Sequence, residues 1–191
     1  MLNEGAYWNR TSGTCPRGQN GATTNCDFSN TGLTEEAKEM IEEVTWKLGG
    51  AFSIRITVPE FYGYERGTTV YTGRPTEWVG KVGLMYPSDY GYATSGGSTT
   101  DRAICLSIDM YDWKDSSDCY NNNWLFNSLT QWPLTSVFSN SYYVFVVNAD
   151  GRFVSSPVYS SYEIRPSIYL KSNISISGGD GSRNNPYVLK A

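Results

Sequence analysis

The side chains best suited to chemistry in this 191-residue sequence are its four cysteines, which fall into two local pairs. Cys15 and Cys26 flank a loop rich in Gly, Thr and Asn, and Cys105 and Cys119 flank a second loop. Four cysteines allow three pairings, and pairing of near neighbours has the lowest loop-closure cost. We therefore predict two disulfides, each stabilising the fold by roughly 2–3 kcal/mol. Reduced structural cysteines and a metal site are the alternatives, but the sequence has no histidine and no closely spaced cysteines to supply metal ligands.

The cysteine pairs also predict where the protein works. Disulfides persist in oxidising compartments, so we expect an extracellular protein. An exported chain needs a targeting segment and none precedes Leu2, so we expect the natural gene to continue upstream and Met1 to be a start added for expression. The net charge of −4 and the lack of a clustered basic face argue against nucleic acid as a partner.

Catalytic constellations are weak in this sequence. Without histidine the commonest general base is missing, and both cysteine pairs are expected to be oxidised. A carboxylate pair remains conceivable among four aspartates that are more typical of a solvated loop: Asp109, Asp112, Asp115 and Asp118. The segment after Asp180 has calcium-type acceptors but only one carboxylate, so a plain turn is favoured. We therefore expect a non-enzymatic protein without cofactor or metal.

The elements that must position these residues include both a helix and β-strands. Thr34 is suited to cap a helix that Gly49-Gly50 ends, with apolar residues at helical spacing: Ala37, Met40, Ile41, Val44 and Leu48. Alternation from Phe52 to Val58 predicts a half-buried strand ended by Pro59, before a tyrosine-rich loop. Further segments are expected to be a strand at residues 78–86, a turn at 87–92 and an exposed loop at 94–101.

The second half of the chain contains the clearest hairpin signal. Residues 143–147 and 152–154 flank Asn148-Ala149-Asp150-Gly151, a typical hairpin turn. Residues 164–170 predict an edge or bulged strand because Pro166 lies within it. A short strand at 174–176 and a polar turn at 178–185 complete a predicted α+β fold, with one N-terminal amphipathic helix and a mostly antiparallel twisted sheet. We expect one head domain over 1–191, with residues 1–50 forming the stapled segment and helix and 51–191 the sheet-rich part.

Between Tyr120 and Tyr162 the composition is unusual, because Ser, Asn and Tyr make up nearly half of the residues. Antibody loops have a similar composition, in which Tyr supplies rigid contact area and Ser and Asn supply adaptable hydrogen bonds. The alternative is that Ser and Asn simply fill loops while the tyrosines pack at half-buried strand positions. This stretch is the candidate ligand surface.

Several phrases resemble secreted proteins of gut Firmicutes, in which such domains often follow a type IV prepilin-like helix. The phrases are 78–93 (WVGKVGLMYPSDYGYA), 123–125, 146–151, 164–170 and 178–187. Their order is also similar to C-type-lectin-like domains, a group that includes the formylglycine-generating-enzyme fold and variable proteins of diversity-generating retroelements. The cysteine spacing departs from the enzyme branch. The calcium motifs Glu-Pro-Asn and Gln-Pro-Asp of sugar-binding lectins are absent.

The resemblance implies roles for individual residues. Trp124, Leu125, Arg165 and Pro166 would be structural core. Ten residues would be ligand contacts: Tyr120, Asn121, Asn122, Ser128, Trp132, Tyr142, Tyr143, Arg152, Tyr159 and Tyr162.

The function implied is that of a pilin-like head at the cell surface or on a pilus, acting in adhesion or ligand binding. Its partners would be other pilin-like subunits, reached through an N-terminal helix missing from this sequence, and a host or bacterial surface protein or glycan. The alternatives are a purely structural shaft subunit without ligand and, less favoured, an enzyme on the formylglycine-generating-enzyme-like fold.

Overall fold

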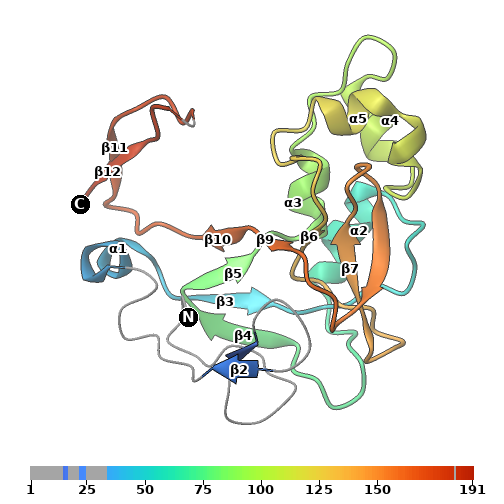
Figure 1. Cartoon of the computed structure of the whole chain (residues 1–191), viewed down its shortest axis with the longest axis horizontal. Helices are drawn as coiled ribbons and strands as arrows, with labels where there is room; N and C mark the ends of the chain where they lie inside the picture. The colour runs from blue at the N-terminus through green and yellow to red at the C-terminus, as the bar shows by residue number, and fades with distance from the viewer. Residues whose placement is uncertain (1–14, 17–21, 25–33, 183) are drawn as a thin grey trace.

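The computed structural model describes residues 15–16, 22–24, 34–182 and 184–191, which form a mixed α and β fold (Figure 1). Almost all strand pairs within it are antiparallel, as predicted. No helix among these residues is long and apolar enough to cross a membrane. The elements in chain order are β1 Cys15–Pro16, β2 Ala22–Thr24, α1 Glu35–Met40, β3 Val44–Lys47, α2 Val58–Glu65, β4 Glu77–Gly80, β5 Val82–Leu84, α3 Pro87–Tyr92, α4 Arg102–Ser107, the 3-10 turn η1 Asp112–Asp115, α5 Ser117–Asn121, β6 Gln131–Trp132, β7 Tyr143–Val147, β8 Phe153–Pro157, β9 Glu163–Ile164, β10 Pro166–Ile168, β11 Ser175–Gly178 and β12 Val188–Lys190.

The largest sheet has the strand order β8-β7-β6-β9, and the predicted hairpin forms its β7–β8 half. The turn is closed by the backbone N–H of Gly151, which donates to the carbonyl of Asn148 over 2.9 Å. Gly151 has φ +83°, and a Cβ there would lie 2.3 Å from the ring of Tyr120. Glycine is therefore required both by backbone conformation and by the aromatic ring packed on it.

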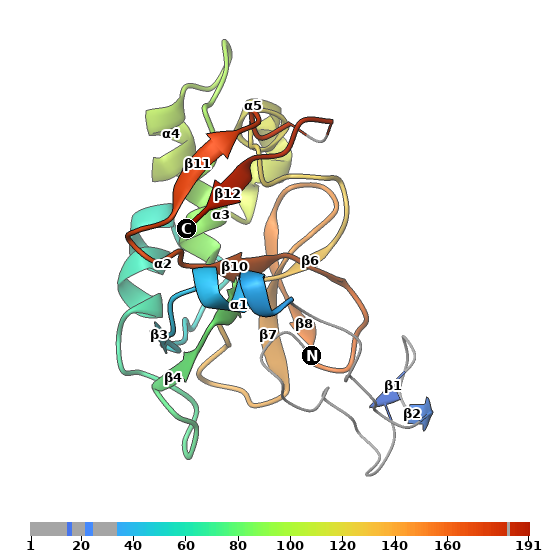
Figure 2. The ribbon, with the colours of Figure 1, turned by 90° about the vertical axis from the view of Figure 1, so that its left-hand side faces the viewer.

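The core lies between this sheet and helices α2 and α3, which cover it (Figures 1 and 2). Phe61 of α2 packs its ring against Phe145 of β7 at 5.3 Å and Phe153 of β8 at 5.2 Å between centroids. Tyr90 of α3 and Trp113 of η1 extend the cluster, and all five rings are fully buried. Each such side chain contributes about 1.5–3 kcal/mol through burial, so this cluster is a major source of the stability of the fold.

The predicted helix over 34–48 is correct only at its start. Thr34 caps α1 by accepting from the backbone N–H of Ala37, but the helix ends at Met40. Val44–Lys47 is instead strand β3, which pairs antiparallel with β4. The reason is tertiary: as a strand residue Trp46 is buried on Gly83, where an added Cβ would approach its ring to 2.7 Å, and its indole N–H donates to the Gly80 carbonyl. Long-range burial therefore overrides the helical spacing.

The predicted strand over 52–58 is wrong, because residues 52–57 form no strand and Val58 opens helix α2. Thr57 and Glu60 form a capping box, in which the Glu60 carboxylate accepts from the Thr57 backbone N–H over 2.8 Å. Pro59 lies in the first turn, where its missing N–H costs nothing. The expected tyrosine-rich loop is therefore the body of this helix, and the expected turn at 87–92 is likewise a helix, α3.

A buried carboxylate joins α2 to α3. Glu65 has no exposed surface, and its oxygens accept from the backbone N–H of Ser88 at 2.7 Å, the Ser88 hydroxyl at 2.5 Å and Arg66 Nη1 at 2.8 Å. Desolvation outweighs these three donors and raises the pKa of Glu65 to about 7. Arg66 in turn stacks over the ring of Tyr62, 3.8 Å from its centroid.

One of the two predicted disulfides is confirmed. Cys105 of α4 is bonded to Cys119 of α5, and both residues are buried beside Trp113 in the core. Trp113 donates from its indole nitrogen to the carbonyl of Cys105 over 3.0 Å. The predicted partner of Cys15, Cys26, lies outside the described residues, so that pairing stays a prediction.

The C-terminal strands follow the predicted order in shorter pieces. The strand expected at 164–170 is divided at Arg165 into β9, which pairs with β6, and β10, which pairs with β5. Pro166 opens β10, a two-stranded pairing in which it occupies an edge, as its missing N–H requires. Beyond it, β11 and β12 form a hairpin that lies apart from α4 and α5 (Figure 1).

Candidate binding sites

Five of the ten predicted ligand residues form two aromatic ring groups on and beside the four-stranded sheet. The ring of Tyr142 lies 5.3 Å from that of Tyr143 and 5.3 Å from that of Tyr159. Trp132 of β6 packs on Tyr162 at 5.0 Å, and the hydroxyls of Tyr162 and Ser156 lie 3.0 Å apart. We name the five aromatic residues the tyrosine surface: Trp132, Tyr142, Tyr143, Tyr159 and Tyr162. Residues 156–162 connect its two ring groups along the chain.

The other predicted contacts lie elsewhere, and two of them serve the fold. Tyr120 packs between Gly151 and Phe126, with its ring 5.2 Å from that of Phe126. Arg152 lies 2.9 Å from Asp150 through Nε and 3.4 Å from the Tyr111 hydroxyl through Nη1. These contacts explain both residues as braces of the β7–β8 turn. The remaining predicted contacts are all exposed: Asn121 ends α5, and Asn122 and Ser128 lie in the segment that follows it.

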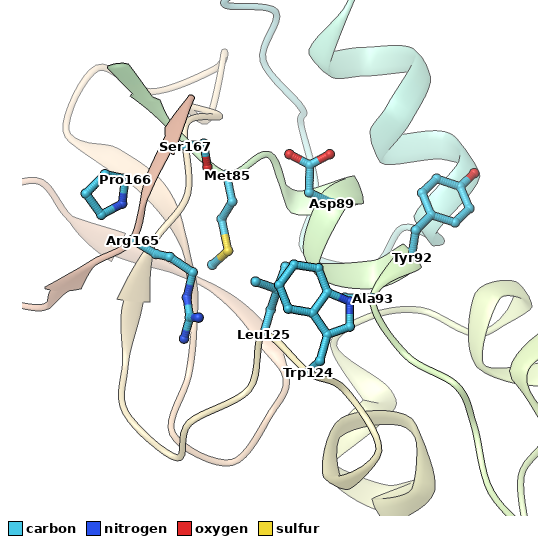
Figure 3. Close-up of a pocket in the computed structure, with 9 residues that line it drawn as sticks. All are labelled: Met85, Asp89, Tyr92, Ala93, Trp124, Leu125, Arg165, Pro166 and Ser167. Atoms are coloured by element: carbon cyan, nitrogen blue, oxygen red, sulfur yellow. The ribbon is translucent and has the colours of Figure 1, made fainter. Parts of the chain in front are cut away.

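A cavity of about 470 Å³ opens where α3 faces β10 (Figure 3). Sequence analysis missed it as a site, because four of its lining residues were assigned to the core. That assignment holds for Leu125, which is buried, but is wrong for Trp124, whose exposed fraction is 75%. Pro166 is exposed and Arg165 half-buried. The lining residues are Met85, Asp89, Tyr92, Ala93, Trp124, Leu125, Arg165, Pro166 and Ser167.

Three local features build this cavity. The antiparallel register sets Pro166 opposite Leu84, which places Arg165 beside Met85 at the end of β5. Helix α3 begins two residues later and presents Asp89 and Tyr92 on the other side (Figure 3). Trp124 is brought to α3 by its neighbour Asn123.

Asn123 is almost fully buried and works as a latch. Its amide nitrogen donates to the carbonyl of Tyr90 in α3 over 2.7 Å. Its amide oxygen accepts from the backbone N–H of Leu125 over 2.9 Å. Both functions of the amide are used, so the chain on either side of Trp124 is fixed while the indole itself stays exposed. Asn123 stands between another asparagine and a tryptophan, and its burial follows neither helical nor strand periodicity. The sequence therefore carried no signal from which this latch could be predicted.

The cavity has opposite charges on opposite sides, with Met85 between them and Trp124 on the side of Asp89 (Figure 3). Asp89 accepts from the backbone N–H of Tyr86 over 2.9 Å through Oδ2. Arg165 donates from Nε to Gln131 Oε1 over 3.1 Å. Each charge is therefore oriented by a partner on its own wall, and the two form no ion pair with one another. This leaves Asp89 Oδ1 and the Arg165 terminal nitrogens without a hydrogen bond to the described parts of the chain.

The acidic residues singled out in the sequence have structural partners. Asp118 accepts from the backbone N–H groups of Thr99 and Thr100 and from the Thr99 hydroxyl, bonds that hold its pKa below the ordinary range. Asp112 pairs with Arg55 at 3.1 Å. Asp180 accepts from the backbone N–H of Ser182, which lowers its pKa and closes a turn. Among the residues that the structure describes, no group of three or more His, Cys, Asp or Glu side chains could hold a metal ion.

No family model, curated protein or solved structure matches this chain. The type IV pilin-like and C-type-lectin-like assignments therefore stay predictions.

Proposed function

We propose that this chain is the head domain of a type IV pilin-like protein, displayed outside the cell, with a C-type-lectin-like surface that binds a protein or glycan in adhesion. The observation that carries the proposal is the tyrosine surface. The Cys105–Cys119 disulfide supports an oxidising location, and it removes two thiols that could serve a catalytic role. The absence of histidine also supports binding without catalysis.

The tyrosine surface has the physical character of a binding patch. Tyr142, Tyr159 and Tyr162 are 45%, 41% and 37% exposed, so each offers side-chain area to a partner. Tyrosine loses little conformational entropy on binding because it has only two side-chain torsions. Here the rings already contact one another, which restricts them further before a partner arrives.

The test is to replace Tyr142 and Tyr159 together by Ser and to measure adhesion of cells displaying the domain to a cultured epithelial layer. These two are chosen because Trp132 and Tyr143 are half-buried, so their loss would also disturb the fold. The matched control is Tyr71→Ser, since Tyr71 is 36% exposed and lies in a separate loop. We expect a severalfold loss of adhesion for the double variant only. Full adhesion with an unchanged circular dichroism spectrum would contradict the assignment.

A structural shaft subunit is the second candidate, and the β11–β12 hairpin favours it. Ile176, Tyr187 and Val188 are 59%, 54% and 56% exposed on and beside this two-stranded hairpin, where an adjoining subunit would cover them. A shaft protein should be the major species in sheared filaments, whereas an adhesin at the tip should be a trace species. Substituting Ile176 and Val188 by Thr should then reduce filament yield, while the tyrosine variants should not.

A further inference from the structure

The cavity between α3 and β10 has the size and lining of a small-molecule site. Its volume of about 470 Å³ lies within the range of roughly 300–1,000 Å³ that ligand pockets occupy. Met85, Leu125 and Pro166 give it apolar surface, and Trp124 stands exposed at its side. A tryptophan that is 75% exposed gains little free energy from burial in the folded protein. A ligand packed on the indole would bury this apolar surface and bind more tightly as a result.

The charged side chains that line the cavity restrict which class of ligand it could bind. A purely anionic ligand would meet Arg165 but also the Asp89 carboxylate, and a purely cationic ligand would meet the reverse conflict. A ligand with a positive and a negative end satisfies both walls at once. Its cationic end would lie at Asp89, on the side of the cavity where Trp124 lies, and its anionic end at the guanidinium of Arg165.

We propose that this cavity binds a zwitterion of the amino acid or short peptide class, with a free ammonium group, a free carboxylate and an apolar body between them. The ammonium group binds Asp89 and the carboxylate binds Arg165. The apolar body packs on Trp124, Met85 and Leu125. This site is separate from the tyrosine surface and does not depend on the adhesive function proposed for that surface.

The first experiment changes the ligand. Leucyl-leucine with both ends free is titrated into the oxidised protein by isothermal calorimetry, beside its N-acetyl form, its C-terminal amide and maltose. We expect the free dipeptide to bind at least about tenfold more tightly than either blocked form, because each block removes a charge-assisted hydrogen bond. No binding of the dipeptide, equal binding of all three peptides, or preferential binding of maltose would each overturn the proposal.

The second experiment tests each blocked dipeptide against a variant of the charged residue that would bind the blocked end. Asp89→Asn keeps an oxygen for the Tyr86 N–H but loses the charge, so the variant should no longer distinguish free from acetylated dipeptide. Arg165→Gln should no longer distinguish free acid from amide. The matched control is Arg74→Gln, which removes a guanidinium outside the cavity and should retain both preferences.

Trp124→Ala keeps the proposal testable if Arg165→Gln does not fold, since Trp124 is largely exposed and its removal spares the core. We expect it to weaken dipeptide binding about tenfold or more, in line with the loss of apolar and cation–π contact. Unchanged affinity in Trp124→Ala, or preferences that persist in both charge variants, would refute the site. The double variant at Tyr142 and Tyr159 should bind the dipeptide as the original protein does, and a loss there would refute the separation of the two sites.

Discussion

Protonation of Glu65 should make this protein more stable in mild acid than at neutral pH. Burial raises the pKa of Glu65 to about 7, against an ordinary value of 4.5. The folded protein therefore holds this proton more tightly than the unfolded chain does. Between these two pKa values the unfolded state binds fewer protons, so the free energy of unfolding falls as pH rises. The loss is complete above the folded pKa.

The magnitude follows from the size of the pKa difference. From 4.5 to about 7, at about 1.4 kcal/mol per pH unit, the whole effect is on the order of 3 kcal/mol. About 2.5 kcal/mol of it falls between pH 5 and pH 8. The sequence contains no histidine, the side chain that ordinarily titrates in this interval. A decline over this range would therefore point directly to Glu65.

Urea unfolding followed by circular dichroism at pH 5, 6, 7 and 8 measures the effect. In Glu65→Gln the amide can still accept from the Ser88 N–H, but it cannot ionise, so its stability should be nearly constant over the range. Glu60→Gln is the control: hydrogen bonds from Thr57 lower the pKa of Glu60, so its titration acts below pH 4.5. Equal declines in the original protein and in Glu65→Gln, or a stability that rises from pH 5 to pH 8, would refute the reasoning.

Two further substitutions test the latch and the disulfide. Asn123→Ala leaves the carbonyl of Tyr90 and one backbone N–H without their partners, so the free energy of unfolding should fall by about 2–4 kcal/mol in a urea titration. A change below about 0.5 kcal/mol would show that the latch is not needed. Replacing Cys105 and Cys119 together by Ala opens a loop with a sequence separation of 14, and should cost about 3 kcal/mol. An unchanged Tm in calorimetry would contradict this.

The parts of the fold that could be predicted are those with local chemistry. The Asp150-Gly151 turn was found because glycine is needed there whatever surrounds it. The start of α1 was found because Thr34 caps it through a neighbouring N–H. The Cys105–Cys119 pair was found from loop length alone. In each case the deciding partner lies within about fifteen residues along the chain.

The predictions that were wrong rest on residues that suit two kinds of structure or on contacts with residues distant in the sequence. Pro59 was interpreted as the end of a strand, yet proline equally suits the first turn of a helix, and the Thr57–Glu60 capping box shows which meaning applies. Strand β3 needed its partner β4, which begins thirty residues beyond Lys47. Trp124 was placed in the core by the resemblance to C-type-lectin-like domains, whereas the buried member of this pair of neighbours is Asn123.

The exposure of Trp124 also gives the protein a built-in optical reporter. Trp46 and Trp113 are buried, so their emission should lie toward shorter wavelengths, whereas the solvated indole of Trp124 should contribute at the red edge of the spectrum. Trp78 is also exposed, at 38%, so the part of the red emission that responds to a molecule covering Trp124 is identified by comparison with a variant that lacks this indole. Occupancy of the cavity could then be followed by light, on unlabelled protein, with Trp124→Phe as the silent reference.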